Sequence, residues 1–439
     1  MSNDDGVLSS IVADLIHDMS NKATGAETYL AGDHADHTWG ITIPHMAFQW
    51  LIGGSTVLPA QRFIGISGEA KSMKSTLQVE IGNWFIDAGG IHVYLDSESK
   101  TSATMMEALS WHNGVADKQR RVYRKTPSID SWQQNATLII KSSRNTGNQP
   151  KGKRVPVFLC VDSLTGSSTE DARQELEKEG AAKARGFPVA AAQVTNYLES
   201  VSLLNTTVNL GWVQHMKKSL EQSGGYGGPD MKEKGASAAT FSCSVHLRVR
   251  KGAKISKKSG HPSQYVEGPT VHGHTLRLTS AMSCVGPDNR SVPVDLMWQF
   301  VDEEVPDGDA GPETSANGEV KTKTANRQVM WFDWDGALGR ILFDMKYSDK
   351  WKPALNAYEK KKLDEAIHFV AGKTTEKVKC KALGFDEDVT FHEFGKAIRE
   401  HPEYSKAVSD FLGIQHHKDV QDADIEFEKP KKKARASRG

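Results

Sequence analysis

Short apolar runs alternate with amphipathic stretches along the middle of the chain, and this alternation limits the fold more than any other feature. The early runs are apolar throughout, as strands buried on both faces of a parallel sheet are. Helical spacing fills intervals such as 77–86 and 194–204. The pattern predicts an α/β core with a mostly parallel sheet. The strand-like runs are RFIGIS (62–67), IHVYLD (91–96), VPVFLCVD (155–162), TTVNLGWVQ (206–214), CSVHLRVR (243–250) and HTLRLTS (274–280).

Composition excludes several classes of protein. No apolar run approaches the roughly 20 residues of a membrane span, and MSNDDGVLSS at the start lacks the features of a secretory signal, so we expect no membrane partner. The four cysteines are widely spaced, which predicts neither a disulfide framework nor a Cys-based zinc site and favours a cytoplasmic location. Lys plus Arg and Asp plus Glu both number 55, so nucleic acid could be bound only through local basic surfaces.

The 439 residues are enough for two or three domains. Residues 1–45 hold an apolar helical stripe and a polar connector, and 46–301 hold the α/β core. Residues 302–325 are acidic and rich in Pro and Gly, which predicts a linker. Residues 326–420 predict a helical accessory domain, with two helices parted near Pro402 and a capping box at Thr390 and Glu393. Residues 421–439 form a basic tail that we expect to be disordered.

The sharpest local motif is GEAKSMKST, which directly follows the first apolar run. It has the G-x-x-x-x-G-K-[ST] spacing of a phosphate loop, except that Met73 replaces the second glycine. Backbone N–H groups, a lysine and a hydroxyl are what phosphates and Mg²⁺ require. Taken alone, the motif also fits a strand-to-helix turn without a ligand. The predicted ATP-binding residues are Gly68, Glu69, Ala70, Lys71, Ser72, Met73, Lys74, Ser75 and Thr76.

Two acidic residues follow later apolar runs and extend this prediction. Asp162 ends its run and can support Mg²⁺ together with Ser75. Glu98 lies just past the run at 91–96, where ligands collect in open α/β sheets. A carboxylate there can orient and deprotonate a water for attack on a γ-phosphate. Either acid alone also fits a helix cap or a solvated turn, but in this order with the phosphate loop they predict Mg²⁺-dependent nucleotide hydrolysis.

The chain resembles the RecA-type recombinase family, most closely its phage strand-exchange members of the UvsX type. The resemblance covers most of the chain and includes a bulky residue before the lysine of the phosphate loop. It implies a RecA-like P-loop ATPase core, a short N-terminal helical segment that packs on a neighbouring subunit, and a small C-terminal helical domain. The similar segments are TIPHMAFQWLIGG, IGISGEAKSMKS, YLDSES, FLCVDSLTG, GWVQH, SVHLRVRKG and FHEFGKAIREHPEYSKAV.

The resemblance implies a role for each matched residue. Lys74 and Ser75 would bind the triphosphate and Mg²⁺, Asp162 would support the metal, and Glu98 would activate water. His215 matches the γ-phosphate sensor, which is His in the phage members and Gln elsewhere; a surface His at a strand end is the alternative.

Gln214 precedes His215 and is included in the predicted sensor. The segments 216–239 and 166–187 match the two DNA-binding loops of the family. The block 248–258 carries six basic residues and no acid, which is typical either of a nucleic-acid surface or of a solvated face. The predicted DNA-binding residues are Lys217, Lys218, Tyr226, Lys232, Lys234, Arg185 and Phe187.

The match departs from the family at two positions. Met105 stands where the family usually stacks a Tyr on adenine, so the way adenine is held stays open. The family also places Lys or Arg in a later strand region to reach a neighbour's ATP. Here the corresponding stretch offers only Arg290, displaced from the expected position.

We therefore expect an ATP-dependent DNA recombinase that forms a homo-oligomeric helical filament on single-stranded DNA and exchanges strands with duplex DNA. Single-strand-binding and mediator proteins are further expected partners. The alternative is a RecA-fold hexameric replicative helicase, which would share the nucleotide site and the DNA loops. A third possibility is a filament protein that holds nucleotide without turnover.

Overall fold

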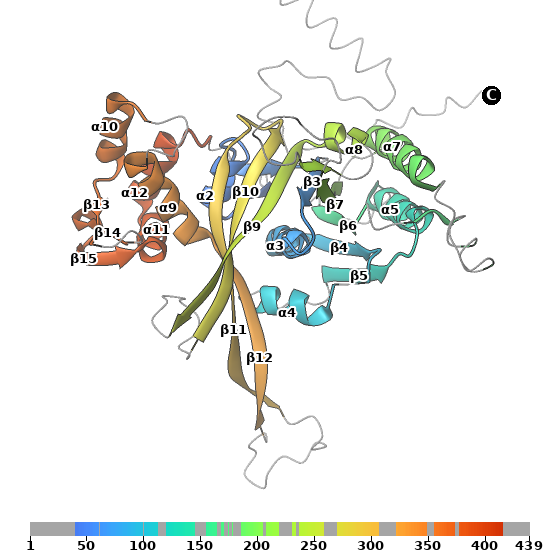
Figure 1. Cartoon of the computed structure of the whole chain (residues 1–439), viewed down its shortest axis with the longest axis horizontal. Coiled ribbons are helices and arrows are strands. Elements are labelled where there is room, and N and C mark those ends of the chain that lie inside the picture. Colours follow the sequence, from blue (N-terminus) through green and yellow to red (C-terminus); the bar gives the residue numbers. More distant parts are fainter. Residues whose placement is uncertain are drawn as a thin grey trace, which may run out of the picture.

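A single large sheet organises the molecule (Figure 1). Its strands follow the order β12-β11-β10-β9-β3-β7-β6-β4-β5, and β8 pairs with β7 off this path. The structure is a computed structural model that describes residues 40–415, except 61, 100, 113–119, 145–154, 165–167, 171–173, 175–177, 179–185, 205–207, 219–230, 234–236, 259–269, 307–321, 349–354 and 374–376.

The half of the sheet from β9 to β5 is parallel, which confirms the predicted α/β class and the mostly parallel sheet. Its inner strands β3, β4 and β6 are almost fully buried, because helices cover both faces. The edge strand β5 was not predicted, since most of its residues are exposed and carry no apolar run. The strands are β3 (Phe63–Gly68), β4 (Ile91–Asp96), β5 (Arg121–Lys125), β6 (Val157–Asp162), β7 (Val208–Lys218), β8 (Met231–Glu233) and β9 (Val245–Lys258).

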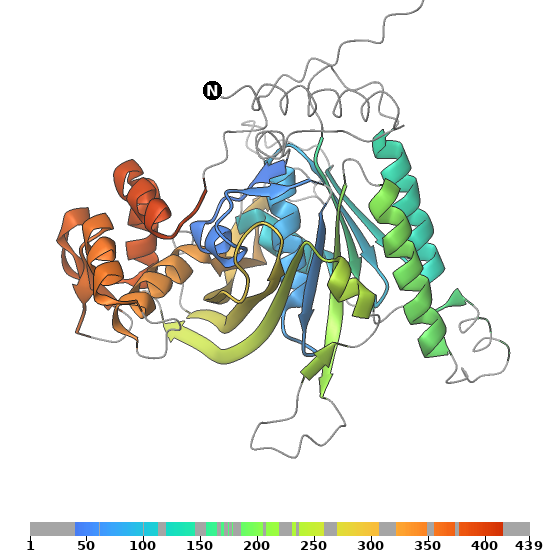
Figure 2. The same cartoon turned by 90° about the horizontal axis from the view of Figure 1, so that it is seen from above.

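Two helical layers cover the parallel strands. On one face lies α3, which is buried on nearly every side although it carries polar residues such as Gln78, Glu80 and Asn83. On the other face α5 and α7 run side by side along one flank (Figure 2), where Trp132 packs edge-on against Tyr197. The helices of the core are α3 (Lys74–Asp87), α4 (Ala103–His112), α5 (Ile129–Arg144), α7 (Gly186–Leu204) and α8 (Ser237–Ser242).

The other half of the sheet is antiparallel and corrects the predicted linker. Strands β10 (Thr270–Ser283), β11 (Ser291–Pro306) and β12 (Thr322–Asp333) extend it beyond β9. Residues 302–306 and 322–325 belong to β11 and β12 and pair across the two strands, so they are not a linker; the rest of the predicted linker, 307–321, lies outside the described residues. The two strands project as an arm from the sheet (Figure 1). Such an arm forms through main-chain hydrogen bonds and needs no apolar face, so the acidic composition gave no strand signal.

The accessory domain consequently begins at α9 rather than at residue 326, because 326–333 lie in the central sheet. The capping box of Thr390 and Glu393 is confirmed at the start of α11, and α12 begins at Pro402 as expected. Of the expected N-terminal helix and connector (1–45), residues 1–39 lie outside the described part, as does the whole expected basic tail (421–439). The domain contains α9 (Trp334–Tyr347), α10 (Ala357–Ala366), β13 (Val370–Ala371), β14 (Lys377–Cys380), β15 (Phe385–Thr390), α11 (Phe391–Glu400) and α12 (Pro402–Phe411).

A short N-terminal segment packs between the core and this domain. It contains β1 (Gly40–Thr42), α2 (Met46–Leu51) and β2 (Val57–Pro59). All four cysteines lie in described segments and are free thiols, in agreement with the expectation of no disulfide framework. Within the described residues, no helix has the length and apolar character required to cross a bilayer.

Candidate nucleotide site

The predicted site residues lie at one edge of the sheet, where four parallel strands end. Gly68 at the end of β3 is in register with His215 on β7, and Asp96 at the end of β4 is in register with Asp162 at the end of β6. Because the carboxyl ends of parallel strands share an edge, the side chains that follow them can converge.

The segment 68–73 makes a tight turn between β3 and α3. A Cβ at Gly68 would come within 2.4 Å of the Val249 carbonyl oxygen, which explains a glycine there. Lys71 and Met73 have positive φ values of 60° and 67°. Met73 is the N-cap of α3 in the left-handed conformation, and its side chain packs partly buried against the core. The backbone therefore turns as a glycine would allow, although the residue is methionine.

Lys74 crosses this turn from the start of α3. Its side chain is buried, and Nζ donates a 2.6 Å hydrogen bond to the carbonyl oxygen of Glu69. In the described structure the N-terminus of α3 receives no side-chain cap and has no acidic residue in its first turn. A helix N-terminus of this kind favours an anion, since the helix dipole and the first-turn N–H groups both point toward it. The turn, the lysine and the helix end thus fit phosphate groups.

Ser75 and Asp162, the predicted metal residues, are brought together. The Ser75 hydroxyl hydrogen-bonds the Asp162 carboxylate, and Tyr94 donates to Asp162 Oδ2 at 2.5 Å. Burial raises the pKa of Asp162 above its usual 3.8, and these two hydrogen bonds oppose the rise. Among the described residues no group of three His, Cys, Asp or Glu could hold a metal by itself. A hydroxyl beside a carboxylate instead fits Mg²⁺ that takes its other ligands from phosphates and water.

Glu98 and His215 meet although they come from different strands. His215 Nε2 donates to Glu98 Oε1 at 2.7 Å, and the Ser163 hydroxyl donates to the same oxygen. The Glu98 side chain is 10 % exposed and that of His215 is 26 % exposed. The carboxylate is thus fixed by two donors at the rim of the site, close to the carboxylate of Asp162.

Gln214 is not part of this group. Successive side chains of a strand point to opposite faces, so Gln214 shares the face of Trp212 rather than that of His215. Trp212 packs into the core cluster formed with α5, α7 and α8, and Gln214 itself is buried. The structure therefore brings His215, but not Gln214, to Glu98.

Met105 and Arg290, the two residues that depart from the pattern of the resembled family, each have defined contacts in the structure. The sulfur of Met105 on α4 lies 3.7 Å from the Thr76 hydroxyl, which places Met105 beside the first turn of α3. Arg290 donates a 2.7 Å hydrogen bond to the Trp50 carbonyl and lies over the Trp50 ring. Burial lowers the pKa of Arg290. Arg290 thus anchors α2 against the strands β10 and β11.

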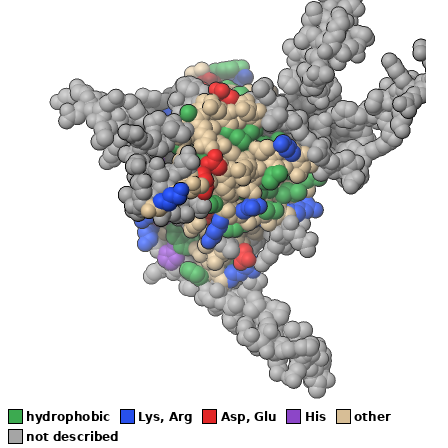
Figure 3. Space-filling view, turned by 90° about the vertical axis from the view of Figure 1, so that its right-hand side faces the viewer, with side chains coloured by type: hydrophobic (Ala, Val, Ile, Leu, Met, Phe, Trp, Pro, Cys, Tyr) green, Lys and Arg blue, Asp and Glu red, His purple; other side chains and the backbone are tan. Residues whose placement is uncertain are grey.

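The predicted second DNA-binding loop begins as a hairpin rather than an open loop. The strand β7 continues three residues past His215 and pairs with β8, with Lys217 opposite Lys232. Lys218 ends β7, and Phe187 lies in the first turn of α7. The remaining predicted DNA-binding residues, Tyr226, Lys234 and Arg185, lie outside the described residues. On the flank carrying α5 and α7, Lys and Arg side chains are spread among other residue types (Figure 3).

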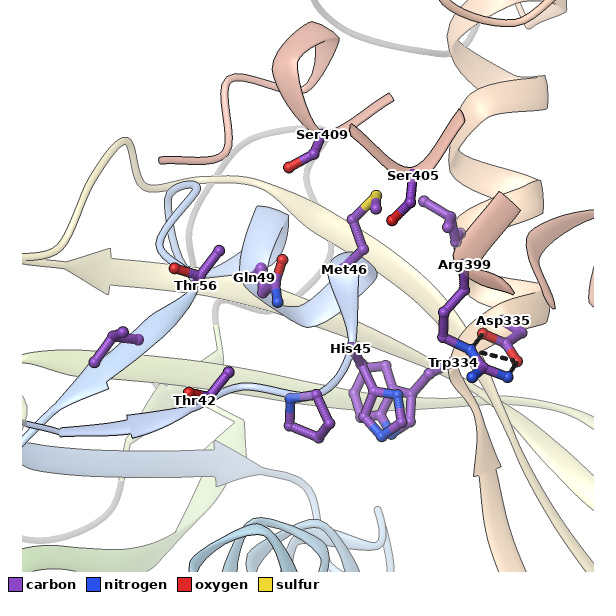
Figure 4. Close-up of a pocket in the computed structure, with 13 residues that line it drawn as sticks. Thr42, His45, Met46, Gln49, Thr56, Trp334, Asp335, Arg399, Ser405 and Ser409 are labelled. Atoms are coloured by element: carbon purple, nitrogen blue, oxygen red, sulfur yellow. Dashed lines mark hydrogen bonds and ion pairs between the residues drawn. The ribbon is translucent and has the colours of Figure 1, made fainter. Parts of the chain in front are cut away.

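A cavity of about 470 Å³ lies elsewhere, between the N-terminal segment and the accessory domain (Figure 4). On one side the His45 ring stacks on Trp334 at 5.5 Å between centroids. On another, Arg399 and Asp335 form an ion pair across α11 and α9. Residues of the N-terminal segment and of the accessory domain thus line the cavity together.

Sequence reasoning missed several residues that shape the candidate site, because a hydrogen-bond partner on another strand leaves no local pattern. The missed residues are Tyr94, Asp96, Thr101, Tyr123 and Ser163. A scan against protein-family models and a search of curated proteins found no match for this chain.

Proposed function

We propose that this chain is an ATP-dependent DNA recombinase that assembles as a helical filament on single-stranded DNA and exchanges strands with homologous duplex. One observation carries the proposal: Glu98 and His215 meet beside Asp162 at the phosphate loop, and the strand that bears His215 runs on into a lysine-bearing hairpin. The order of the matching segments along the sequence supports it further.

Hydrolysis would use the residues that the turn brings together. Lys74 would leave the Glu69 carbonyl and bind the β- and γ-phosphate oxygens, while the first turn of α3 binds the remaining charge. Glu98 would orient a water and take its proton as the water oxygen bonds the γ-phosphorus. The bond from that phosphorus to the β–γ bridging oxygen breaks, and ADP leaves. Mg²⁺, held at Ser75 and Asp162, would neutralise phosphate charge.

His215 links this chemistry to DNA. Its ring contacts the carboxylate that activates water, and two residues later β7 carries Lys217 in the hairpin with β8. A γ-phosphate that binds the imidazole would change the position of the strand end and therefore of the hairpin. DNA bound at the hairpin would act on Glu98 through the same strand in the reverse direction.

The direct test is ATP hydrolysis with single-stranded DNA present. We expect Lys74→Ala to lose ATP binding and turnover, because no other described side chain replaces its buried ammonium in the turn. Glu98→Gln should keep ATP binding, lower turnover by about 100-fold or more, and stabilise the DNA complex. Lys361→Ala and Glu365→Gln on the exposed surface of α10 are matched controls. Undiminished hydrolysis in Glu98→Gln would remove Glu98 from the catalytic role.

A further inference from the structure

We propose that Asp96 is the positioning residue for Glu98 and that Tyr123, on the edge strand β5, holds Asp96 in place. The inference rests on the proposed function, in which Glu98 activates water. Asp96 ends β4 two residues before Glu98, and its side chain is only 1 % exposed. Burying a carboxylate costs free energy unless hydrogen-bond donors surround it. The donors to Asp96 therefore identify the segment that it holds in place.

Both Asp96 oxygens accept hydrogen bonds from the turn that carries Glu98. Oδ1 accepts from the backbone N–H of Glu98 at 2.9 Å and from that of Ser99 at 2.6 Å. Oδ2 lies 3.3 Å from the backbone N of Thr101 and accepts from it. Ser99 has a φ of 54°, a left-handed conformation that disfavours a residue with a Cβ. The turn thus wraps around one carboxylate, which stabilises a backbone shape that its sequence would not adopt readily.

The side chains of this turn point into the site while Asp96 itself does not. Glu98 reaches His215 and Ser163, and the Thr101 hydroxyl lies 3.4 Å from Asp162 Oδ2. Asp96 therefore orients two groups of the site, while its own oxygens accept hydrogen bonds from the turn and from Tyr123. Hydrogen bonds to an ionised acceptor are stronger than neutral ones, so a carboxylate orients the turn better than an amide would.

Tyr123 supplies the fourth hydrogen bond, from the neighbouring strand. Its hydroxyl donates to Asp96 Oδ2 at 2.7 Å, and its ring stacks on that of Tyr94. Burial, followed by the hydrogen bond and the charge of Asp96, raises the pKa of Tyr123 to about 12. The hydroxyl accordingly stays protonated and donates throughout the neutral range. The ring is 40 % exposed on β5, so an edge strand at the surface forms part of the support of the catalytic base.

Steady-state ATP hydrolysis by the full chain with single-stranded DNA tests this inference. We expect Asp96→Asn to lower kcat by about 10- to 100-fold, a smaller loss than that of Glu98→Gln, with KM for ATP changed less than about threefold. Tyr123→Phe removes one hydroxyl and keeps the ring, so kcat should fall by about three- to tenfold and the melting temperature should hold. Tyr197→Phe is the matched control, because its hydroxyl bonds Gln133 and Thr137 far along the α5–α7 layer.

A double-mutant comparison separates positioning from a purely structural role. If Asp96 acts through Glu98, adding Asp96→Asn to Glu98→Gln should cost almost no further activity. An equal loss in both backgrounds, a wild-type kcat in Asp96→Asn, or a loss of ATP affinity as large as that of kcat would overturn the inference. If Asp96→Asn does not fold, Tyr123→Phe decides alone: a wild-type kcat overturns the inference, and a lowered kcat that disappears in the Glu98→Gln background supports it.

The failure of this inference can be told from failure of the proposed function. A wild-type chain without ATP turnover, or a Glu98→Gln variant with full turnover, would overturn both. A slow Glu98→Gln variant beside a fully active Asp96→Asn variant would overturn the positioning role alone.

Discussion

Met73 occupies, at a φ of 67° and a ψ of 28°, the position that a glycine takes in the common phosphate-loop pattern. A left-handed conformation costs a residue with a Cβ about 1–2 kcal/mol relative to glycine. The packing of its side chain against the core offsets that cost. The conformation of the turn is therefore set by its place between β3 and α3, and methionine is tolerated there because its long side chain reaches apolar surroundings.

Comparing Met73→Gly with Met73→Ala measures the free-energy cost of the left-handed backbone conformation for a residue with a Cβ. Both variants lose the side-chain packing, but only Ala keeps the Cβ. We expect Met73→Gly to be more stable than Met73→Ala by about 1 kcal/mol in urea unfolding. Lys361 is an exposed position within α10 and serves as the control. There we expect Lys361→Ala to be more stable than Lys361→Gly, since Ala is the better helix former. Equal stability of the two Met73 variants would contradict the left-handed assignment.

His92 is expected to make the free energy of unfolding depend on pH. It is fully buried, and both ring nitrogens lack a hydrogen-bond partner among the described residues. Burial, aided by the positive charge of Arg121, lowers its pKa well below 6.5. The unfolded chain binds a proton at His92 below pH 6.5 while the folded chain does not, so stability is present above that pH and lost as pH falls.

Urea unfolding at pH 7.5 and 5.5 measures this effect. The free energy of unfolding of the wild type should fall by about 1 kcal/mol more than that of His92→Gln, in which this site does not titrate. All other titrating groups are common to the two proteins and cancel in the comparison. The same pH dependence in both would show that His92 is not held neutral.

At the scale of elements, the buried strands of the sheet could be predicted from the sequence, whereas the edge strand β5 and the arm of β11 and β12 could not. The strands β3, β4 and β6 are buried on both faces, so each appears in the sequence as a continuous apolar run. β5 and the arm of β11 and β12 depend on main-chain pairing with neighbours, which leaves no such run.

The same distinction holds for the site. Lys74 and Asp162 follow from motif and strand order, whereas the partners of Asp96 depend on how a turn folds back and on which strand lies beside β4.

The hairpin of β7 and β8 is expected to bind single-stranded DNA. Lys217 and Lys232 are paired in register across its two strands, and in the proposed function this hairpin binds DNA. We expect Lys217→Ala/Lys232→Ala to weaken binding of single-stranded DNA and to reduce the slope of log affinity against log salt by about 1 to 2. Lys361→Ala/Lys362→Ala on α10 is the matched control. An unchanged slope would contradict the assignment of this hairpin to DNA.

Across the whole molecule, the formal net charge of zero is a sum over separate blocks. Six basic residues fall between 248 and 258, and six acidic residues fall between 302 and 313. The first block lies in β9, and the second begins in β11, on the far side of β10. Charge is therefore segregated by strand, and a neutral chain can still present basic segments to a polyanion.

The accessory domain packs tightly within itself and also contacts the core, where the Trp334 indole at the start of α9 donates a hydrogen bond to Glu80 of α3. A Cβ at Gly395 on α11 would come within 1.9 Å of the Asp335 carbonyl oxygen, so α9 and α11 cross at the closest distance that a glycine permits. Since α9 begins at the residue that follows β12, the domain is connected to the central sheet without an intervening linker.

Electron microscopy of the full chain with single-stranded DNA and a non-hydrolysable ATP analogue tests the central claim most directly. The proposed recombinase predicts helical filaments that form with the analogue and are lost without nucleotide or in Lys74→Ala. Closed rings, or filaments that form equally well without nucleotide, would contradict it.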